Sequence, residues 1–291
     1  MAALAEVKTQ KVATHPRNSY VIQATSNQDC AWHGKSDDGT FEFVAVSDSH
    51  GRSVRNNKDT IINECIYRNW SKFLQQEDWV ESFVEDTCNN ITRGIGATFT
   101  LVKIFADRFE CYWVGDSTAK IYCGDELIFK TVDHCNQNQK EIERLMECKF
   151  QTKNGWDIAP KDSETLLSFP SKFFVKNREG CNMTRSLGHG GVFNEGLECP
   201  ISKATIPRDA EQTYKVIAAT DGLWGMVATD DSDKSFISDT SVTSQQLANF
   251  ASERWNRAWT WDNSAGEIKT NIKLPKNNID DIGVSVWTDR S

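Results

Sequence analysis

The chain has 291 residues, of which 38% are hydrophobic and 25% are charged, and its formal net charge is −8. This composition predicts an ordinary folded protein with a large core and excludes a largely disordered chain. The acidic balance argues against a nucleic-acid partner held by a broad basic surface.

Nine cysteines are scattered along the chain without a Cys-x-x-Cys pair, so neither a zinc site nor a complete disulfide framework is indicated. The first residues lack the apolar core of a signal peptide, and no stretch reaches the roughly 18 apolar residues that would suggest a membrane span. We therefore expect an intracellular protein of the cytoplasm or nucleus, with reduced thiols and no membrane association.

Six segments are rich in β-branched and aromatic residues and have the alternating or continuous apolar pattern of strands. In chain order they are 41–47, 97–105, 109–115, 118–123, 214–220 and 282–287. The connections that join the second, third and fourth of these segments are too short to contain crossover helices. We therefore expect those three strands to form an antiparallel meander.

Apolar residues recur at helical spacing in three further stretches, 62–73, 142–146 and 247–258. Antiparallel strands with long helices between them indicate an α+β fold rather than a doubly wound parallel sheet. Residues 150–180 are polar and contain two prolines, which predicts a surface flap. No repeat or linker is evident, so we expect a single domain over residues 1–291.

Carboxylates stand at the ends of these predicted strands. Asp48 follows the first strand in FVAVSDSHGR, Asp221 follows a later one, and Asp116 lies between two strands. Asp280 precedes the last strand, and Asp29 follows a possible earlier one. Any one of these alone is typical of a turn.

The residues after Asp48 suggest a second kind of site, a Ser49/His50 nucleophile pair. Adjacent residues of an extended chain point to opposite sides, so these two side chains cannot readily activate each other. A metal site is the stronger hypothesis, because converging carboxylates repel unless a cation lies between them. Oxygen ligands without a His/Cys cluster favour Mg²⁺ or Mn²⁺ over zinc, and such ions support hydrolysis or phosphoryl transfer.

Eight short motifs occur in the order SNQD (26–29), VSDSHG (46–51), GATFT (96–100), VGDSTA (114–119), TVDH (131–134), TRSLG (184–188), ATDGLW (219–224) and DDIGV (280–284). Together they resemble the PP2C family of metal-dependent serine/threonine protein phosphatases over nearly the whole chain. The resemblance implies an α+β fold, with a central antiparallel β-sandwich flanked by helices on both sides. It also implies two Mg²⁺ or Mn²⁺ ions and a phosphorylated protein as substrate.

The resemblance assigns metal-binding roles to five residues. It implies that Asp48 bridges both ions, that Asp221 and Asp280 are direct ligands, and that Asp29 holds an ion through water. Ser49 stands where the family usually has glycine and where the backbone carbonyl is a ligand. A change of side chain leaves such a carbonyl in place.

His50 matches the proposed general acid of the family. Its ordinary pKa near neutrality suits proton donation to a departing serine or threonine oxygen. The implied reaction is hydrolysis of phosphoserine and phosphothreonine by water activated between two metals, without a covalent enzyme intermediate.

Some positions depart from the family pattern. His189 and Gly225 replace aspartates of the family, and these replacements weaken the prediction of a third ion. Asp116 is retained from that outer site. Asp281 stands where the family usually has asparagine.

Ala24 stands where the family has an arginine that binds substrate phosphate. Arg17 and Arg52 are candidate substitutes. The departures keep two alternatives open: a degenerate relative that binds a phosphoprotein with little or no turnover, and a hydrolase of small phosphorylated molecules. The sequence does not predict the oligomeric state.

Overall fold

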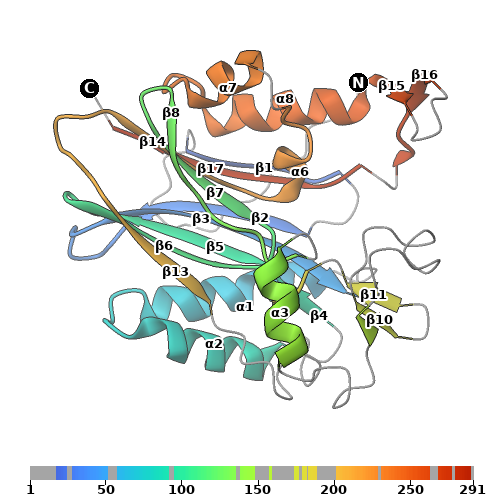
Figure 1. Ribbon diagram of the computed structural model, residues 1–291. Coiled ribbons are helices and arrows are strands. Elements are labelled where there is room, and N and C mark those ends of the chain that lie inside the picture. The colour runs from blue at the N-terminus through green and yellow to red at the C-terminus, as the bar shows by residue number, and fades with distance from the viewer. Residues whose placement is uncertain are drawn as a thin grey trace.

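The computed structural model describes residues 18–24, 28–51, 58–91, 95–135, 138–147, 157–158, 174–176, 179–181, 183–188, 201–228, 231–262, 268–276 and 279–289. Two antiparallel sheets lie face to face, with α7 and α8 above them and α1 and α2 below (Figure 1). This arrangement confirms the predicted α+β sandwich with helices on both sides.

The upper sheet has five strands in the order β1 (Ser19–Ile22), β17 (Ile282–Thr288), β14 (Tyr214–Ala219), β7 (Thr118–Cys123) and β8 (Glu126–Lys130). The lower sheet follows the order β12 (Leu187–Gly188), β4 (Ile95–Ala97), β3 (Glu42–Gly51), β5 (Phe99–Ile104), β6 (Arg108–Val114) and β13 (Ser202–Pro207). In that sheet β2 (Asp29–Lys35) also pairs with β3. Every strand pairing in both sheets is antiparallel.

The main helices are α1 (Lys58–Phe73), α2 (Trp79–Asn90), α3 (Gln139–Glu147), α6 (Asp221–Trp224), α7 (Asp231–Ser238) and α8 (Ser244–Asn256). Two small sheets complete the described elements. One contains β9 (Asp157–Ile158), β10 (Phe174–Lys176) and β11 (Glu179–Cys181), which overlap the predicted flap at 150–180. The rest of that flap lies outside the described residues. The other pairs β15 (Ala258–Asp262) with β16 (Ile268–Lys273).

The apolar core has three layers, and alternation along β3 shows how the sequence divides between them. Val44 and Val46 point between the two sheets, whereas Phe43 and Ala45 point toward α1 and α2. Successive strand side chains face opposite sides, so a strand covered on both faces needs the continuous apolar run seen here. A third layer joins the upper sheet to α6, α7 and α8.

Trp70 is the centre of the lower layer. It is fully buried on α1 and contacts the rings of Trp32, Phe43, Tyr67 and Phe99 at centroid distances of 5.1 to 6.1 Å. Several of these rings meet edge to face, the arrangement that aromatic pairs favour. The helical stripe predicted from residue 62 onward is therefore a core face.

The predicted meander is wrong in its third strand. β5 pairs with β6, but β7 pairs with β14 and β8 in the other sheet. Gly115 has φ 94°, and a Cβ there would lie 2.6 Å from the Thr98 side chain. Glycine thus permits the turn that carries the chain from one sheet to the other, and Asp116 is placed at this crossing.

The predicted C-terminal helix ends earlier than its apolar spacing suggested. α8 stops at Asn256, and Ala258 begins strand β15. The start of α8 has a capping box, in which Thr243 and Gln246 each satisfy the other's backbone N–H. Within the part of the chain that the structure describes, no helix is long and apolar enough to cross a membrane.

Candidate metal centre

Asp29 and Asp48 lie directly opposite each other on the neighbouring strands β2 and β3. Asp29 opens β2 rather than following a strand, and Asp48 lies within β3, which continues to Gly51. The Asp48 N–H donates to Thr98 Oγ1 at 2.9 Å, and the Thr98 N–H donates to the Asp48 carbonyl at 2.8 Å. Thr98 therefore fixes the backbone of Asp48 from both sides.

Asp221 and Asp280 are brought to the same end of the sandwich by the contact between α6 and the segment before β17. Asp221 is the first residue of α6, immediately after β14. A Cβ on Gly222 would lie 1.8 Å from the carbonyl oxygen of Asp281, so only glycine allows this approach. The Asp281 N–H donates to Asp280 Oδ1 at 3.0 Å and orients that carboxylate.

The inner carboxylates have raised pKa values. Burial, followed by the charges of Asp29, Asp221 and Asp280, raises the pKa of Asp48 well above its ordinary value. Burial and the charge of Asp221 raise the pKa of Asp280 to about 7. Both shifts have the direction expected of carboxylates that share one site without counter-charge.

Asp29 and Asp221 complete this inner group. Burial raises the pKa of Asp29 well above its ordinary value, although Thr220 Oγ1 donates to its Oδ2 at 2.6 Å and opposes the shift. One side of Asp221 is exposed to solvent, yet surrounding protein atoms and the charge of Asp116 raise its pKa to about 7. Asp221 is the carboxylate on the solvent side of the group.

Asp116 and Asp133 form an outer pair. Burial is the main cause that raises the pKa of Asp116 to about 6, and the charges of Asp133 and Asp280 contribute to the same shift. Asp133 accepts a hydrogen bond from Thr118 Oγ1 at 2.7 Å. Asp133 was not among the residues predicted for the site, although its place in the TVDH motif was a signal for it.

The chemistry of this donor set fits hard divalent cations that keep several bound waters. Among the described residues, none of the ion pairs joins a lysine or arginine to Asp29, Asp48, Asp116, Asp221 or Asp280. Within the same part of the chain, no three ligand side chains lie close enough to enclose an ion directly. Mg²⁺ needs no such enclosure, because it retains most of its water and binds through one or two carboxylates.

Ser49 and His50 make separate hydrogen bonds, as their opposite directions on β3 predict. The Ser49 N–H and Oγ both donate to the Gln28 carbonyl at 3.0 Å. His50 Nε2 lies 3.1 Å from Ser186 Oγ, on the segment before β12. The Ser/His nucleophile pair is therefore not formed, and the roles of the Ser49 carbonyl and of His50 stay predictions.

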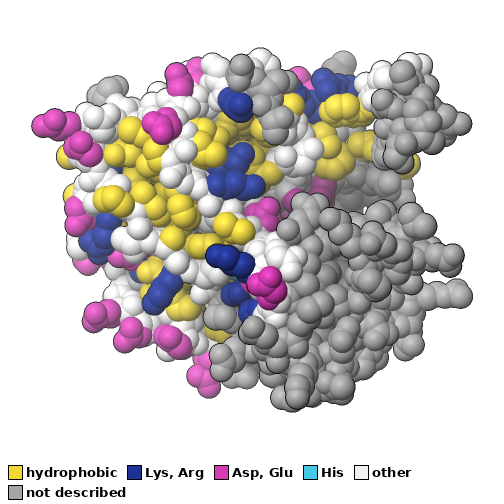
Figure 2. Space-filling model, viewed as in Figure 1, with side chains coloured by type: hydrophobic (Ala, Val, Ile, Leu, Met, Phe, Trp, Pro, Cys, Tyr) yellow, Lys and Arg dark blue, Asp and Glu magenta, His cyan; other side chains and the backbone are white. Residues whose placement is uncertain are grey.

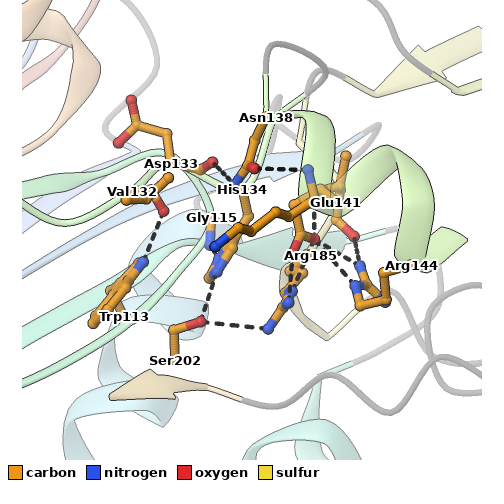
Figure 3. Close-up of polar contacts among 12 residues, drawn as sticks. Trp113, Gly115, Val132, Asp133, His134, Asn138, Glu141, Arg144, Arg185 and Ser202 are labelled. Carbon is orange, nitrogen blue, oxygen red and sulfur yellow. Dashed lines mark hydrogen bonds and ion pairs between the residues drawn. The ribbon is translucent and has the colours of Figure 1, made fainter. Parts of the chain in front are cut away.

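The segment that carries Ser186 is held by a buried carboxylate, Glu141 of α3. Glu141 pairs with Arg185 through both oxygens and accepts a hydrogen bond from Arg144 Nη2 at 2.8 Å (Figure 3). It also accepts a hydrogen bond from Thr184 Oγ1 at 2.9 Å. Burial alone would raise the pKa of Glu141, but the hydrogen bonds from Arg185 and Arg144 lower it to about 2. α3 thus positions the residue that contacts His50.

His134 links the same region to the Asp116 turn (Figure 3). The Gly115 N–H donates to His134 Nδ1 at 3.1 Å, which leaves Nε2 to donate to Ser202 Oγ at 2.9 Å. The ring stacks on Trp113 with 8° between the planes. Burial and the nearby Arg185 lower the pKa of His134 to about 3, so it is neutral and structural.

Asp281 binds the backbone at Ala24, the position of the family's missing arginine, and at Gln28. Its carboxylate accepts a hydrogen bond from the Ala24 N–H at 2.6 Å and another from the Gln28 N–H at 2.8 Å. A carboxylate at this position therefore anchors both residues. Ala24 is exposed, and the candidate substitutes Arg17 and Arg52 lie outside the described residues.

Gly225 and His189 stand at the two outer-site positions where the family has aspartates. Gly225 is exposed and follows α6 in ordinary right-handed helical backbone, with φ −63°. It brings no carboxylate toward Asp116. His189 lies outside the described residues.

The sequence profile of the family described as Protein phosphatase 2C matches residues 17–260. Comparison with curated protein sequences finds no match.

Solved structures with a similar fold include a sex determining protein of C. elegans, with a TM-score of 0.61 and 14% identity over 93% of this chain. The match covers 64% of that protein, so the chain spans less than two thirds of its length. The serine-threonine phosphatase 2C of Toxoplasma gondii has a TM-score of 0.57 and 13% identity over 95% of this chain and 96% of the other.

A third similar structure is the catalytic domain of the serine threonine protein phosphatase PstP in complex with two manganese ions. It has a TM-score of 0.52 and 13% identity over 93% of this chain and 95% of the other. Because the sequence identities are this low, the similarity of these structures shows the fold alone.

Proposed function

Because the chain belongs to the protein phosphatase 2C family, we propose that it hydrolyses phosphoserine and phosphothreonine on proteins with two bound Mg²⁺ or Mn²⁺ ions. The observation that carries the proposal is the group of carboxylates gathered at one end of the sandwich without a cationic side chain among the described residues. Like charges so arranged destabilise the fold unless a cation is bound. We further propose that the chain works as one domain.

The proposal assigns Asp48, Asp221 and Asp280 as the side chains that hold the ions, with Asp29 acting through water and the Ser49 carbonyl as a further ligand. When bound, the ions would supply an activated water and neutralise charge on the phosphate. The pairing of β2 with β3 places Asp29 beside Asp48, and the Thr220 hydroxyl fixes Asp29.

We assign His50 as the general acid that protonates the departing serine or threonine oxygen. Ser186 lies within hydrogen-bond distance of its Nε2 and fixes the ring. The Glu141–Arg185 pair in turn holds the backbone next to Ser186. A proton donor that keeps one orientation loses less entropy on reaching the transition state.

A second candidate function is favoured by one observation, the exposed methyl group of Ala24 at the position where the family carries its phosphate-binding arginine. A site that lacks a bidentate partner for phosphate holds its substrate less firmly. The alternative is therefore a phosphoprotein-binding relative with little or no turnover. Introducing the guanidinium distinguishes the two: under the enzyme proposal, Ala24→Arg lowers KM about 10-fold with little change in kcat.

The main test measures phosphate release from phosphoserine and phosphothreonine peptides with and without Mn²⁺. We expect metal-dependent turnover by wild type, a loss of about 100-fold or more in Asp221→Ala, and no loss in the control Asp37→Ala. Asp37 is exposed and lies beyond the far end of β2 from Asp29. Binding of the phosphopeptides without turnover would instead support the alternative.

The same assay run with small phosphorylated metabolites separates protein substrates from small ones. The protein-phosphatase proposal expects a higher kcat/KM for phosphopeptides. A preference for the metabolites would reject the substrate class while keeping the hydrolase.

A further inference from the structure

Two lysines, Lys120 and Lys130, lie directly opposite each other on the neighbouring strands β7 and β8. Like charges in this arrangement are destabilising, whereas opposite charges across a ladder are stabilising. Other lysines of the described strands have the favourable arrangement: Lys35, Lys103 and Lys176 each lie across from a glutamate. The placement of Lys120 opposite Lys130 is therefore a feature that the stability of the sheet does not explain.

The lysine pair also lacks a carboxylate partner in the part of the chain that the structure describes. None of the ion pairs found there includes Lys120 or Lys130. Asp29 and Asp48 of the candidate metal centre are a second like-charged pair on neighbouring strands. Two carboxylates so placed indicate a cation, and by the same reasoning two ammonium groups indicate an anion.

Trp224 holds the Lys120 ammonium in place. Lys120 Nζ lies 4.0 Å from the centroid of the Trp224 ring, a favourable contact between a cation and an aromatic face. The ring is itself fixed, because Trp224 Nε1 donates a hydrogen bond to the Thr118 carbonyl at 3.0 Å. Trp224 ends α6, and Asp221 begins it. Lys120 is thus positioned by the short helix that carries a candidate metal ligand.

The lysine pair borders the outer side of the candidate metal centre. Thr118 Oγ1 donates to Asp133 of the outer pair at 2.7 Å, and Lys120 lies on the same face of β7 as Thr118, about 7 Å along the strand. Lys130 precedes Asp133 by three residues, so their Cα atoms are at most about 11 Å apart. Burial and the charge of Lys130 lower the pKa of Lys120 to about 8, and the charge of Asp133 opposes that shift.

A ligand can reach the lysine pair from solvent. Lys130 is exposed and Lys120 is half-buried. Figure 2 shows Lys and Arg side chains among hydrophobic ones over the part of the molecule where β7 and β8 lie in Figure 1. Val132, which is 59% exposed, stands between Lys130 and Asp133 in the chain and offers an apolar contact beside the pair.

We propose that Lys120 and Lys130 bind an anionic side chain of the phosphoprotein substrate, and so select substrates with an acidic or second phosphorylated residue near the one that is dephosphorylated. This inference rests on the proposed function and assigns substrate specificity to the same site. An extended peptide spans about 3.5 Å per residue, so the anionic side chain lies about two to four residues from the phosphoserine. The second contact offsets the grip on substrate that the site lacks at Ala24.

Binding of peptides that contain a non-hydrolysable phosphonate analogue of phosphoserine tests the inference without requiring turnover. Fluorescence anisotropy with wild type and Mn²⁺ compares a peptide with neutral flanks to peptides that carry glutamate or phosphoserine at one flanking position, scanned on both sides. We expect the best acidic position to lower the dissociation constant about 10-fold. The gain should shrink as salt is raised, because the lysines are partly exposed to solvent.

Methionine variants assign the preference to the two lysines. Lys120→Met keeps an unbranched side chain on the Trp224 ring, and Lys130→Met changes an exposed residue. Each is expected to reduce the preference for the acidic peptide about 3-fold, and the double variant is expected to abolish it. The matched control is Lys35→Met, an exposed lysine at the far end of β2 from Asp29, which should keep the full preference.

Equal affinity of wild type for neutral and acidic peptides would overturn the inference, as would a preference that survives in the double variant. Phosphate release from the matching phosphoserine peptides is measured separately. Release without an acidic preference in binding would reject the lysine site and keep the proposed function. An acidic preference that depends on both lysines, without any release, would keep the lysine site and reject the proposed function.

Discussion

Replacing Asp280 by asparagine should stabilise the metal-free protein. The Asp280 carboxylate helps to raise the pKa values of Asp29 and Asp48, and its own pKa is raised by burial and by the charges of Asp221 and Asp281. Asparagine removes the charge but keeps an oxygen that can accept the Asp281 N–H, now bound by Asp280 Oδ1 at 3.0 Å. The substitution therefore changes the electrostatics of the site with little change in its hydrogen bonding.

The magnitude follows from the pKa. The pKa of Asp280 rises from 3.8 to about 7, a shift of about 3 units, and at about 1.36 kcal/mol per unit this gives about 4 kcal/mol. Asp280 is only half-buried, and solvent screening reduces the expected gain to about 2 kcal/mol. For a chain of this size, that gain raises the melting temperature by about 4 °C.

The gain should depend on pH. The folded chain keeps the Asp280 proton up to about pH 7, whereas the unfolded chain releases it near pH 3.8. The stability of wild type therefore falls as pH rises across this window. The advantage of Asp280→Asn is full above about pH 7 and disappears below pH 3.8.

The assay is urea unfolding of EDTA-treated protein at several pH values, with Asp37→Asn as the matched control for loss of one exposed carboxylate. Added Mn²⁺ should reverse the order, stabilising wild type more than Asp280→Asn, because ligand binding to the folded state adds to its stability. An Asp280→Asn variant that is less stable than wild type without metal at pH 8 would refute the electrostatic reasoning.

Three other substitutions test the packing around the site. Trp70→Ala should lower the free energy of unfolding by about 4 kcal/mol in urea titrations, through loss of the central buried ring. Glu141→Gln should lower the free energy of unfolding by about 3 kcal/mol, because it leaves Arg185 without its buried partner. The pKa of Glu141 is about 2 in the folded chain and 4.5 in the unfolded chain, so the advantage of wild type is full above pH 4.5 and fades toward pH 2. Gly222→Ala should reduce both the melting temperature and the stabilisation by Mn²⁺, because its Cβ would meet the Asp281 carbonyl at 1.8 Å and displace α6. An unchanged response to Mn²⁺ in Gly222→Ala would contradict the placement of α6.

Local patterns determined most of the elements. The apolar run before Asp48 predicts a buried strand, and helical spacing from residue 62 predicts a helix whose core face includes Trp70. Both are confirmed by the sandwich and by the burial of Trp70. These predictions succeed because the period of side-chain direction is fixed by the geometry of the strand or helix itself.

Sheet order was decided only in the tertiary structure. Short connections predicted that β7 would pair with β6, but the turn at Gly115 takes β7 to the other sheet, beside β14. A turn of the same length can join neighbours in one sheet or bridge two packed sheets. The choice depends on which apolar faces the strands bury, and those faces are completed by residues far away in the chain.

The same limit applies to the candidate site. The motifs named Asp48, Asp221 and Asp280, but strand register and the Gly222 contact bring Asp29 opposite Asp48 and carry Asp221 toward Asp280. The hydrogen bond from Ala24 to Asp281 joins residues 257 positions apart, and the pairing of Glu141 with Arg185 joins residues 44 positions apart. The sequence by itself determined which chemical groups are present, whereas the tertiary structure decided which of them are neighbours, because long-range contacts arise from the packing of whole sheets and helices.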